Sequence, residues 1–249
     1  MGLSFSQLLI YLLFTRRCPF CNEVIKFEDH LCKNCEKELP LVKGNICKKC
    51  GCEKKYCKCG KMHEFDAAVA PLYYEKPFNK GLLVFKNNRE KWRAKDFAAY
   101  MAATFKERFY DEEIDFAVCV PDHKARIHDK LKGPRIGYHV SPTITLASAV
   151  SDALGIELKT NILYFAKETK TRQQALSLHA RKANVFGSID VNFKDCNLLG
   201  KNVLIIDDVM TTGATTSECA KMLKLYGADK VFVVTLFTAK REKKAKKSS

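Results

Sequence analysis

The sequence has no hydrophobic run long enough to cross a membrane. The apolar stretch at its start, "MGLSFSQLLIYLLFTRRC", is far shorter than the roughly 20 residues that a spanning helix needs. It has no basic residue ahead of it and no small-residue cleavage site, so it does not fit an export signal. We therefore expect residues 1–16 to form a short amphipathic or buried helix of a cytoplasmic protein, with peripheral membrane contact as the minor alternative.

Acidic residues are scarce relative to basic ones. The chain of 249 residues has 28 Asp and Glu against 43 Lys and Arg, which gives a formal net charge of +15. Residues 240–249, "KREKKAKKSS", have almost nothing to bury, so we expect a disordered basic tail. The rest of the surplus is typical of proteins that bind phosphates of nucleic acids, nucleotides or anionic membranes. A surplus that only serves solubility is the plainer alternative.

Cysteine is abundant, and nine of the 12 cysteines lie between Cys18 and Cys59. Without an export signal, a secreted disulfide scaffold is disfavoured. A C-x2-C turn delivers two of the four thiolates of a tetrahedral zinc site, so the doublets predict one or two structural zinc ions within residues 17–62. One site would use Cys18, Cys21, Cys32 and Cys35, and a second would use Cys47, Cys50, Cys57 and Cys59.

Other arrangements of these cysteines stay open at this point. The doublets could interleave, Cys52 could replace one member, and redox cysteines or an iron–sulfur cluster are the alternatives to zinc. His63 follows the last doublet and, as a lone histidine, is expected to be a surface residue rather than a ligand.

From residue 65 onward, strand-like and helix-like segments alternate. Helices are predicted over 94–109, 142–155 and 216–227, the first with Phe97, Met101, Phe105 and Phe109 on one stripe. Strands that are apolar on both faces imply a parallel sheet covered by helices on both sides, so we predict an α/β domain over residues 63–239. The apolar runs that predict strands are 66–74, 116–120, 162–166, 185–189, 202–207 and 230–237.

Residues 203–216, "VLIIDDVMTTGATT", place two adjacent carboxylates at the end of one such strand. In open α/β sheets ligands bind beyond the carboxyl ends of strands, and the N–H groups that begin a helix bind anions. Gly213 permits a tight left-handed turn and a close approach of a phosphate, and the threonines add hydroxyl donors. Two adjacent acids can accept hydrogen bonds from the neighbouring hydroxyls of a ribose. The stretch therefore predicts a site that binds a sugar diol next to a loop that binds its phosphate.

This stretch resembles the ribose-5-phosphate signature of the type I phosphoribosyltransferases, which bind phosphoribosyl pyrophosphate (PRPP) with Mg²⁺. The resemblance implies that Asp207 and Asp208 hold the ribose hydroxyls, and it makes both acids catalytic candidates as general bases toward an incoming nucleobase. The implied fold class is α/β, a type I phosphoribosyltransferase-like parallel sheet flanked by helices, with a small N-terminal zinc-binding module. The implied ligands of the 5-phosphate are Thr211, Thr212, Gly213, Ala214 and Thr215.

A cysteine module ahead of this fold resembles the ComF family of competence proteins, which help to import single-stranded DNA in natural transformation. The resemblance continues in "RRCPFC", in "LYYEKPFNKGLLVFKNN", an aromatic strand followed by a helix and a lysine, and in "CVPDHKAR". The last segment implies that Arg126 contacts pyrophosphate, although Ile136 and His139 stand where the family has arginine and asparagine. "TRQQALSLHARKANVFG" resembles the mobile loop that covers PRPP, which implies PRPP contacts for Gln173 and Arg181.

The sequence therefore favours a zinc-binding ComF-family protein whose partners are PRPP, single-stranded DNA and a DNA-uptake helicase or channel. Two rivals remain. One is a metabolic phosphoribosyltransferase of nucleobase salvage or nucleotide synthesis, which would need a base-binding hood where this chain has a lysine tail. The other is a non-catalytic scaffold that PRPP gates. The aromatic residues that could stack on DNA bases, with core packing as the plainer role, are Phe20, Phe27, Tyr56, Tyr73 and Tyr74.

Overall fold

The computed structural model describes residues 16–26, 28–57, 59, 63–88, 90–121, 141–166, 189–192 and 197–240. Apart from Arg16 and Lys240, the expected N-terminal helix and basic tail lie outside these ranges. Within the described part of the chain, no helix is both long enough and apolar enough to cross a membrane.

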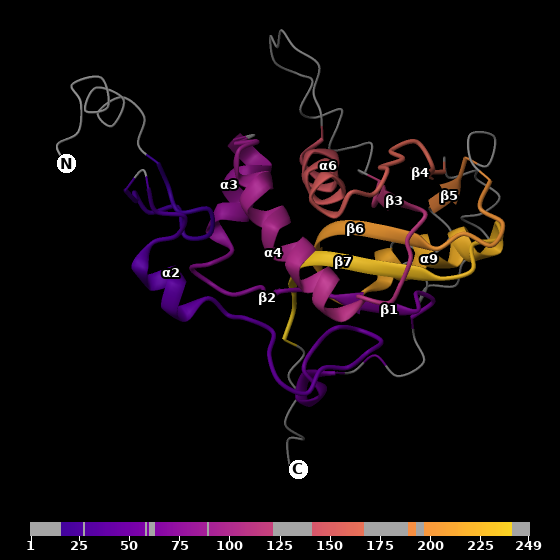
Figure 1. Cartoon of the computed structure of the whole chain (residues 1–249), viewed down its shortest axis with the longest axis horizontal. Coiled ribbons are helices and arrows are strands. Elements are labelled where there is room, and N and C mark those ends of the chain that lie inside the picture. Colours follow the sequence, from indigo (N-terminus) through magenta and orange to yellow (C-terminus); the bar gives the residue numbers. More distant parts are fainter. Residues whose placement is uncertain are drawn as a thin grey trace, which may run out of the picture.

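A parallel sheet forms the centre of the molecule (Figure 1). Its strand order is β1-β7-β6-β3, and β2 pairs with β7 beyond the end of β1. Every pairing in this sheet is parallel, as the alternation of apolar runs and helices predicts. The strands are β1 (Ala67–Val69), β2 (Leu72–Tyr73), β3 (Phe116–Cys119), β6 (Val203–Met210) and β7 (Val231–Thr238).

Helices cover both faces of this sheet, because the strands bury alternate side chains in opposite directions. Leu204 and Ile206 of β6 pack in one hydrophobic cluster with α4 (Arg93–Arg108) and α6 (Pro142–Leu154). Val203 and Ile205 of the same strand pack in a second cluster with α9 (Ala214–Leu225). The predicted sheet with helices on both sides is therefore confirmed.

The helix boundaries follow from local sequence. On α4 the predicted stripe is confirmed, since Phe97, Met101 and Phe105 are buried. Helix α6 begins where the Ser141 hydroxyl accepts a hydrogen bond from Thr143 N and ends at Gly155, whose φ of 71° suits a residue without a β-carbon.

Two predicted strands pair outside the main sheet. β4 (Leu163–Phe165) and β5 (Ile189–Val191) form a separate antiparallel pair. Of the predicted strand over 185–189, only Ile189 lies in the described residues. Antiparallel strands need no crossover helix, which agrees with the absence of a predicted helix between them.

The cysteine-rich segment has little regular structure, but it shares a core with the sheet domain. Its regular elements are α2 (Lys33–Glu38) and the 3-10 helix η1 (Lys54–Tyr56). Cys18, Phe20 and Cys35 are fully buried in the same hydrophobic cluster as Phe97 and Leu72. In Figure 1, α2 lies at one side of the sheet and η1 lies below it, with α3 (Lys80–Asn88) between α2 and the remaining helices.

Candidate functional site

The two predicted ribose ligands lie near the carboxyl end of β6. Strand β6 continues through Asp207 and Asp208, because Val209 and Met210 still pair with Phe237 and Thr238 of β7. The acids are therefore inside the strand rather than after it. Consecutive residues of a strand point to opposite faces, so the two carboxylates leave β6 on different sides.

Asp208 forms an ion pair that the sequence does not indicate. Its Oδ2 lies 2.6 Å from Nζ of Lys86 on α3, and its side chain is only 11% exposed. This lysine is part of the segment that resembles the ComF family, but nothing local to it in sequence indicates which acid it meets. A cation therefore stands beside one of the two expected hydroxyl acceptors.

Asp207 lies on the side of α9. Its Oδ1 accepts a hydrogen bond of 2.8 Å from the backbone N–H of Asp208, which orients the carboxylate along its own strand. Burial, with a further contribution from the nearby charge of Asp207, raises the pKa of the Cys219 thiol on α9. Asp207 and Asp208 thus occupy different electrostatic surroundings, although they are neighbours in sequence.

The loop between β6 and α9 has the form expected of an anion site. Gly213 has a φ of 78° and gives its carbonyl to Ser217 N and to the hydroxyl of Thr216. Thr211, Thr212 and Ala214 are exposed, and Thr215 is half-buried, so this loop and the first turn of α9 can be reached from solvent. We call residues 211–215 the threonine loop. Exposed hydroxyls and the positive end of the α9 dipole can together hold a phosphate.

The ring of His63 packs against the threonine loop. The expectation of a surface histidine is wrong, because His63 is only 6% exposed. Its ring stacks on Phe65 at 4.7 Å and lies so close to Gly213 that an added β-carbon there would be 2.8 Å from Cε1 of His63. A lone histidine in sequence carries no sign of this packing. In the structure, the N–H of the neighbouring Glu64 donates a hydrogen bond to the hydroxyl of Ser217 on α9.

The remaining predicted PRPP contacts, Arg126, Gln173 and Arg181, lie outside the described residues. Their roles stay predictions.

The first cysteine cluster consists of Cys18, Cys21, Cys32 and Cys35, whose Sγ atoms all lie within 4.8 Å of one another. Cys21 Sγ and Cys32 Sγ are 3.4 Å apart. Tetrahedral zinc with Zn–S bonds of about 2.3 Å places its sulfurs about 3.8 Å apart, so four thiols at this spacing fit one zinc ion. All four are buried free thiols, which is typical of a closed structural site.

The second cysteine cluster consists of Cys47, Cys50, Cys57 and Cys59 and also lies within 4.8 Å. The Sγ distances are 3.7 Å for Cys47–Cys59 and 3.6 Å for Cys50–Cys57. Burial alone would raise the pKa of the Cys47 thiol, but the backbone N–H of Cys50 and the thiol of Cys57 contribute to lowering it to about 7. The doublets therefore do not interleave, and each cluster offers a separate four-thiol site.

Cys52 is not a member of either cluster. It is fully buried, and its Sγ lies 3.2 Å from Oγ1 of Thr238 at the end of β7. Thr238 in turn donates from Oγ1 to the carbonyl of Met210, the last residue of β6 before the threonine loop. Cys52, which packs with Cys50 and Cys59 of the second cluster, thus joins that cluster to the carboxyl ends of β6 and β7.

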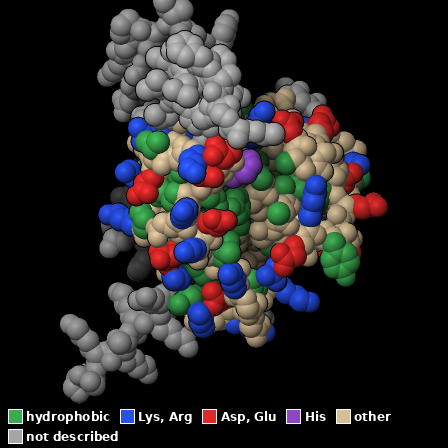
Figure 2. All heavy atoms as spheres, turned by 60° about the vertical axis from the view of Figure 1, so that its left-hand side comes forward, with side chains coloured by type: hydrophobic (Ala, Val, Ile, Leu, Met, Phe, Trp, Pro, Cys, Tyr) green, Lys and Arg blue, Asp and Glu red, His purple; other side chains and the backbone are tan. Residues whose placement is uncertain are grey.

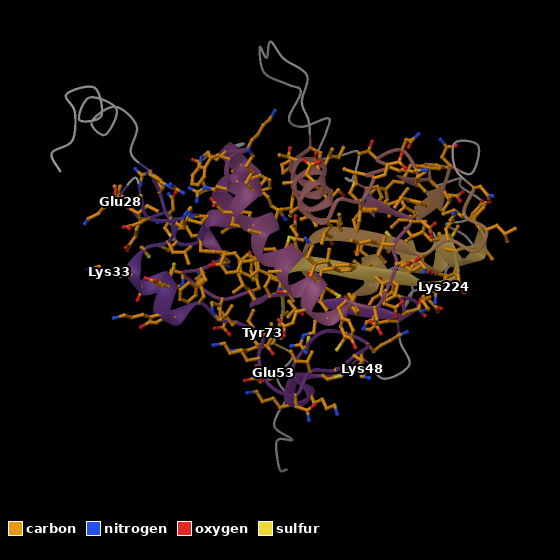
Figure 3. All side chains as sticks on the ribbon, viewed as in Figure 1. Glu28, Lys33, Lys48, Glu53, Tyr73 and Lys224 are labelled. Atoms are coloured by element: carbon orange, nitrogen blue, oxygen red, sulfur yellow. The ribbon has the colours of Figure 1, made fainter. Side chains whose placement is uncertain are left out.

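A second contact joins the segment that carries the second cysteine cluster to the sheet. The backbone N–H of Glu53 donates to the hydroxyl of Tyr73 on β2 at 3.2 Å. Figure 3 shows Glu53 and Tyr73 at the lower border of the sheet, where the second cluster lies.

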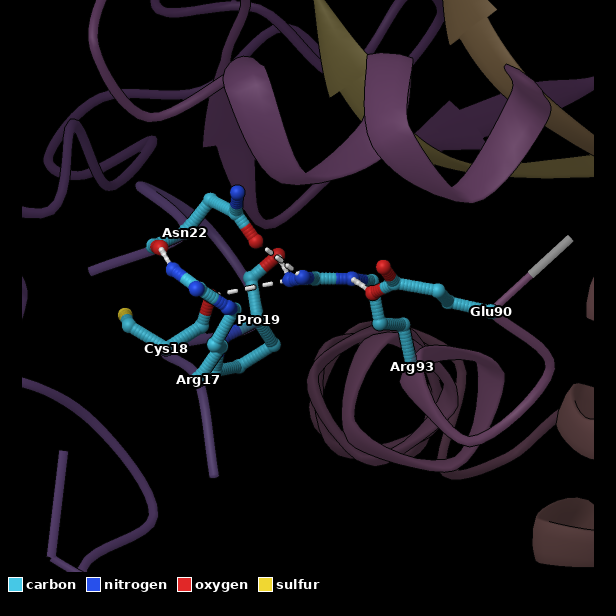
Figure 4. A network of polar contacts seen from close by, with 6 residues as sticks. All are labelled: Arg17, Cys18, Pro19, Asn22, Glu90 and Arg93. Carbon is cyan, nitrogen blue, oxygen red and sulfur yellow. Dashed lines mark hydrogen bonds and ion pairs between the residues drawn. The ribbon is translucent and has the colours of Figure 1, made fainter. Parts of the chain in front are cut away.

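A fully buried arginine joins the first cluster to the sheet domain (Figure 4). Nη1 of Arg93 on α4 donates to the carbonyls of Cys18 and Pro19 at 2.9 Å each, and Nη2 donates to Oδ1 of Asn22. Glu90 balances the guanidinium charge through a contact of 2.6 Å to Nε. The turn that carries Cys18 and Cys21 is therefore held by its backbone as well as by its thiols.

The proposed base-stacking aromatics are largely core residues. Phe20 and Tyr73 are 0% and 2% exposed, so they cannot stack on bases, whereas Tyr74 is half-buried and packs edge-on against Phe237. Tyr56 is half-buried with its ring against Tyr73, and Phe27 lies outside the described residues.

The surface on the side of α2 carries charges of both signs. Figure 2 shows Lys and Arg interspersed with Asp and Glu around a central group of apolar side chains. On this face, among the described residues, the basic surplus is spread rather than gathered in one patch.

Two domain families match the chain. A double zinc ribbon domain matches residues 9–65, and a phosphoribosyl transferase domain matches residues 143–249. The first match contains both cysteine clusters, and the second contains β6, the threonine loop and α9. The type I phosphoribosyltransferase-like fold with an N-terminal zinc ribbon is therefore confirmed.

Known proteins resemble the chain over different lengths. Competence protein F of Haemophilus influenzae is 26% identical over 230 residues, which cover 88% of this chain and 96% of that protein. The transcriptional regulator GfcR of Methanocaldococcus jannaschii is 36% identical over 93 residues, but these cover only 37% of this chain and 38% of the regulator. The solved hypoxanthine-guanine phosphoribosyltransferase of Bacillus anthracis aligns with 64% of this chain and 77% of its own, at 15% identity and a TM-score of 0.37.

Proposed function

We propose that this chain, a homologue of competence protein F with a double zinc ribbon and a phosphoribosyltransferase domain, binds PRPP with Mg²⁺ and handles incoming single-stranded DNA. The observation that carries the proposal is the arrangement of β6, the threonine loop and α9. An acid pair near the end of β6, a glycine at φ 78° and exposed threonines follow one another in sequence up to the first turn of α9. This combination suits a sugar that carries both free hydroxyls and a phosphate.

Each part of the site has a separate task in this proposal. The threonine loop and the N–H groups that begin α9 bind the 5-phosphate through Thr211, Thr212 and Thr215. A ribose bound by both acids would reach the carboxylates of Asp207 and Asp208 on the two sides of β6, just before the strand ends at Met210. His63, packed against Gly213, keeps the loop close to the strand end.

The donor set also fits Mg²⁺ bound together with PRPP. Asp207 and Asp208 offer carboxylate oxygens, the ligand type that Mg²⁺ prefers, and this ion usually binds through one or two carboxylates plus substrate phosphates. When bound, Mg²⁺ would neutralise charge on the pyrophosphate of PRPP. The residues of this chain would orient the ribose and exclude alternative positions of its phosphate.

Single-stranded DNA is the proposed polyanionic partner. The net charge of +15 and the basic residues of the zinc ribbon and the tail would follow DNA phosphates, so binding should weaken steeply as salt is added. Because Phe20 and Tyr73 are buried, we expect charge rather than base stacking to contribute most to DNA binding. We place the protein in the cytoplasm, with a DNA-uptake helicase or channel as its protein partner.

Calorimetry tests whether the chain binds PRPP. We expect the zinc-loaded protein to bind PRPP in the presence of Mg²⁺, and a double variant, Asp207→Asn with Asp208→Asn, to lose that binding while single-stranded DNA binding stays intact. Absence of PRPP binding by the unsubstituted protein would overturn the proposal.

The chemistry is tested separately, by measuring pyrophosphate release with single-stranded DNA present. Release would show a transferase, and turnover with a free purine or pyrimidine would show a metabolic enzyme instead. Binding without release would show that no transfer occurs, which favours the model in which PRPP only gates DNA or partner contact.

A further inference from the structure

The ion pair between Lys86 and Asp208 joins α3 to the proposed ribose site. Nζ of Lys86 is 2.6 Å from Oδ2 of Asp208, and the two side chains are 32% and 11% exposed. A carboxylate this shielded from water is costly unless a cation or hydrogen-bond donors compensate it. Lys86 supplies that compensation at one of the two acids of the site.

Lys86 is held in place because α3 rests on the first cysteine cluster. The backbone N–H of Gly81, in the first turn of α3, donates to the carbonyl of Phe20, and the carbonyl of Pro19 leaves no room for a side chain at Gly81. Farther along α3, Leu82 and Phe85 are buried in the hydrophobic cluster that also contains Phe20. These contacts fix α3 against the turn that carries the first cysteine cluster. In this position the Lys86 ammonium contacts the Asp208 carboxylate.

The charge of this lysine matters for an anionic ligand. Two adjacent carboxylates repel each other, and both repel the phosphates of a sugar phosphate. An ammonium bound to Asp208 offsets this repulsion and fixes one oxygen of the carboxylate, which leaves the other oxygen for a sugar hydroxyl.

We propose that Lys86 is a positioning residue of the sugar-phosphate site, acting through Asp208. Its ammonium orients the Asp208 carboxylate and offsets its charge against the phosphates of the ligand. This inference rests on the proposed function, since it specifies how the same site accepts an anionic sugar.

The test is a titration of PRPP with Mg²⁺ into four zinc-loaded proteins: the unsubstituted chain, Lys86→Met, Lys86→Arg and Lys80→Met. Lys80 is exposed at the start of the same helix, so Lys80→Met makes the same change of charge away from the site. We expect Lys86→Met to weaken PRPP binding at least tenfold, Lys86→Arg to restore it to within about threefold, and Lys80→Met to leave it unchanged. Zinc content and melting temperature, measured without ligand, establish that each variant is folded.

A double-mutant cycle then tests whether Lys86 acts through Asp208. The variant that combines Lys86→Met with Asp208→Asn should bind PRPP no more weakly than Asp208→Asn alone, because the lysine has lost its partner. PRPP binding by Lys86→Met equal to that of the unsubstituted protein would overturn the inference. So would purely additive losses in the cycle. Absence of binding by the unsubstituted protein would instead overturn the proposed function itself.

Discussion

The ring of His63, which follows the last cysteine doublet, lies against Gly213 of the threonine loop. The ring is stacked on Phe65, and an added β-carbon at Gly213 would lie 2.8 Å from Cε1 of His63. Gly213 is therefore restricted twice, by its φ of 78° and by the neighbouring ring. The zinc-ribbon end of the chain and the phosphate end of the proposed site thus meet in one contact.

This contact predicts a specific loss in Gly213→Ala. The matched control is Gly155→Ala, since Gly155 has a similar φ of 71° but nothing within 4 Å of an added β-carbon. A left-handed alanine costs about 1 kcal/mol at either position, so both variants should melt a few degrees lower. Only Gly213→Ala should also lose affinity for PRPP, measured by calorimetry.

Truncation of the ring offers an independent check of the same contact. Adding His63→Ala to Gly213→Ala removes the crowding and should recover part of the lost stability. If Gly213→Ala and Gly155→Ala behave alike in both stability and PRPP binding, crowding by His63 has no role in this loop.

The two cysteine clusters predict a metal count. The unsubstituted chain should carry two zinc ions, measured by atomic emission, since each cluster supplies four thiols. Cys50→Ser should retain about one zinc ion, whereas Cys52→Ser, which changes a buried cysteine outside both clusters, should retain two. A loss of one zinc ion in Cys52→Ser would show that the ligand set of the second cluster is wrong.

Arg93 predicts a large cost for one substitution on α4. Arg93→Met leaves the carbonyls of Cys18 and Pro19 without their buried donor and removes the partner of Glu90. We expect a loss of about 3 kcal/mol in the free energy of unfolding, measured with denaturant on the zinc-loaded protein. The control Arg108→Met removes an exposed arginine of the same helix and should change stability by less than about 0.5 kcal/mol. Equal effects of the two substitutions would mean that the first cluster does not depend on this arginine.

Much of the fold could be predicted because its signals are local. The apolar run before Asp207, the stripe that begins at Phe97 and the glycine that ends α6 each fix an element within a few residues. The pairing of cysteines could not be settled in this way, since interleaved doublets satisfy the same spacing. Only the positions of the Sγ atoms separate the two clusters.

The site was less predictable, because its decisive contacts join residues far apart in the chain. Nothing near Lys86 in sequence indicates that it meets Asp208, and nothing near His63 indicates that it packs against Gly213. The apolar run predicts that β6 ends at Asp207, which is too early, because the polar residues there give no sign of the continued pairing with β7 through Met210. The sequence pattern of one segment does not show which distant segment it contacts in the folded protein.

The central claim is that Asp207 and Asp208 recognise neighbouring hydroxyls of a sugar whose phosphate lies in the threonine loop. The most direct measurement compares ribose 5-phosphate with 2-deoxyribose 5-phosphate by calorimetry on the zinc-loaded protein. Loss of a hydrogen bond to a charged acceptor predicts binding of the deoxy sugar about 10- to 100-fold weaker, and the variant with both Asp207→Asn and Asp208→Asn should bind neither sugar. Equal affinity of the unsubstituted protein for the two sugars would contradict the account.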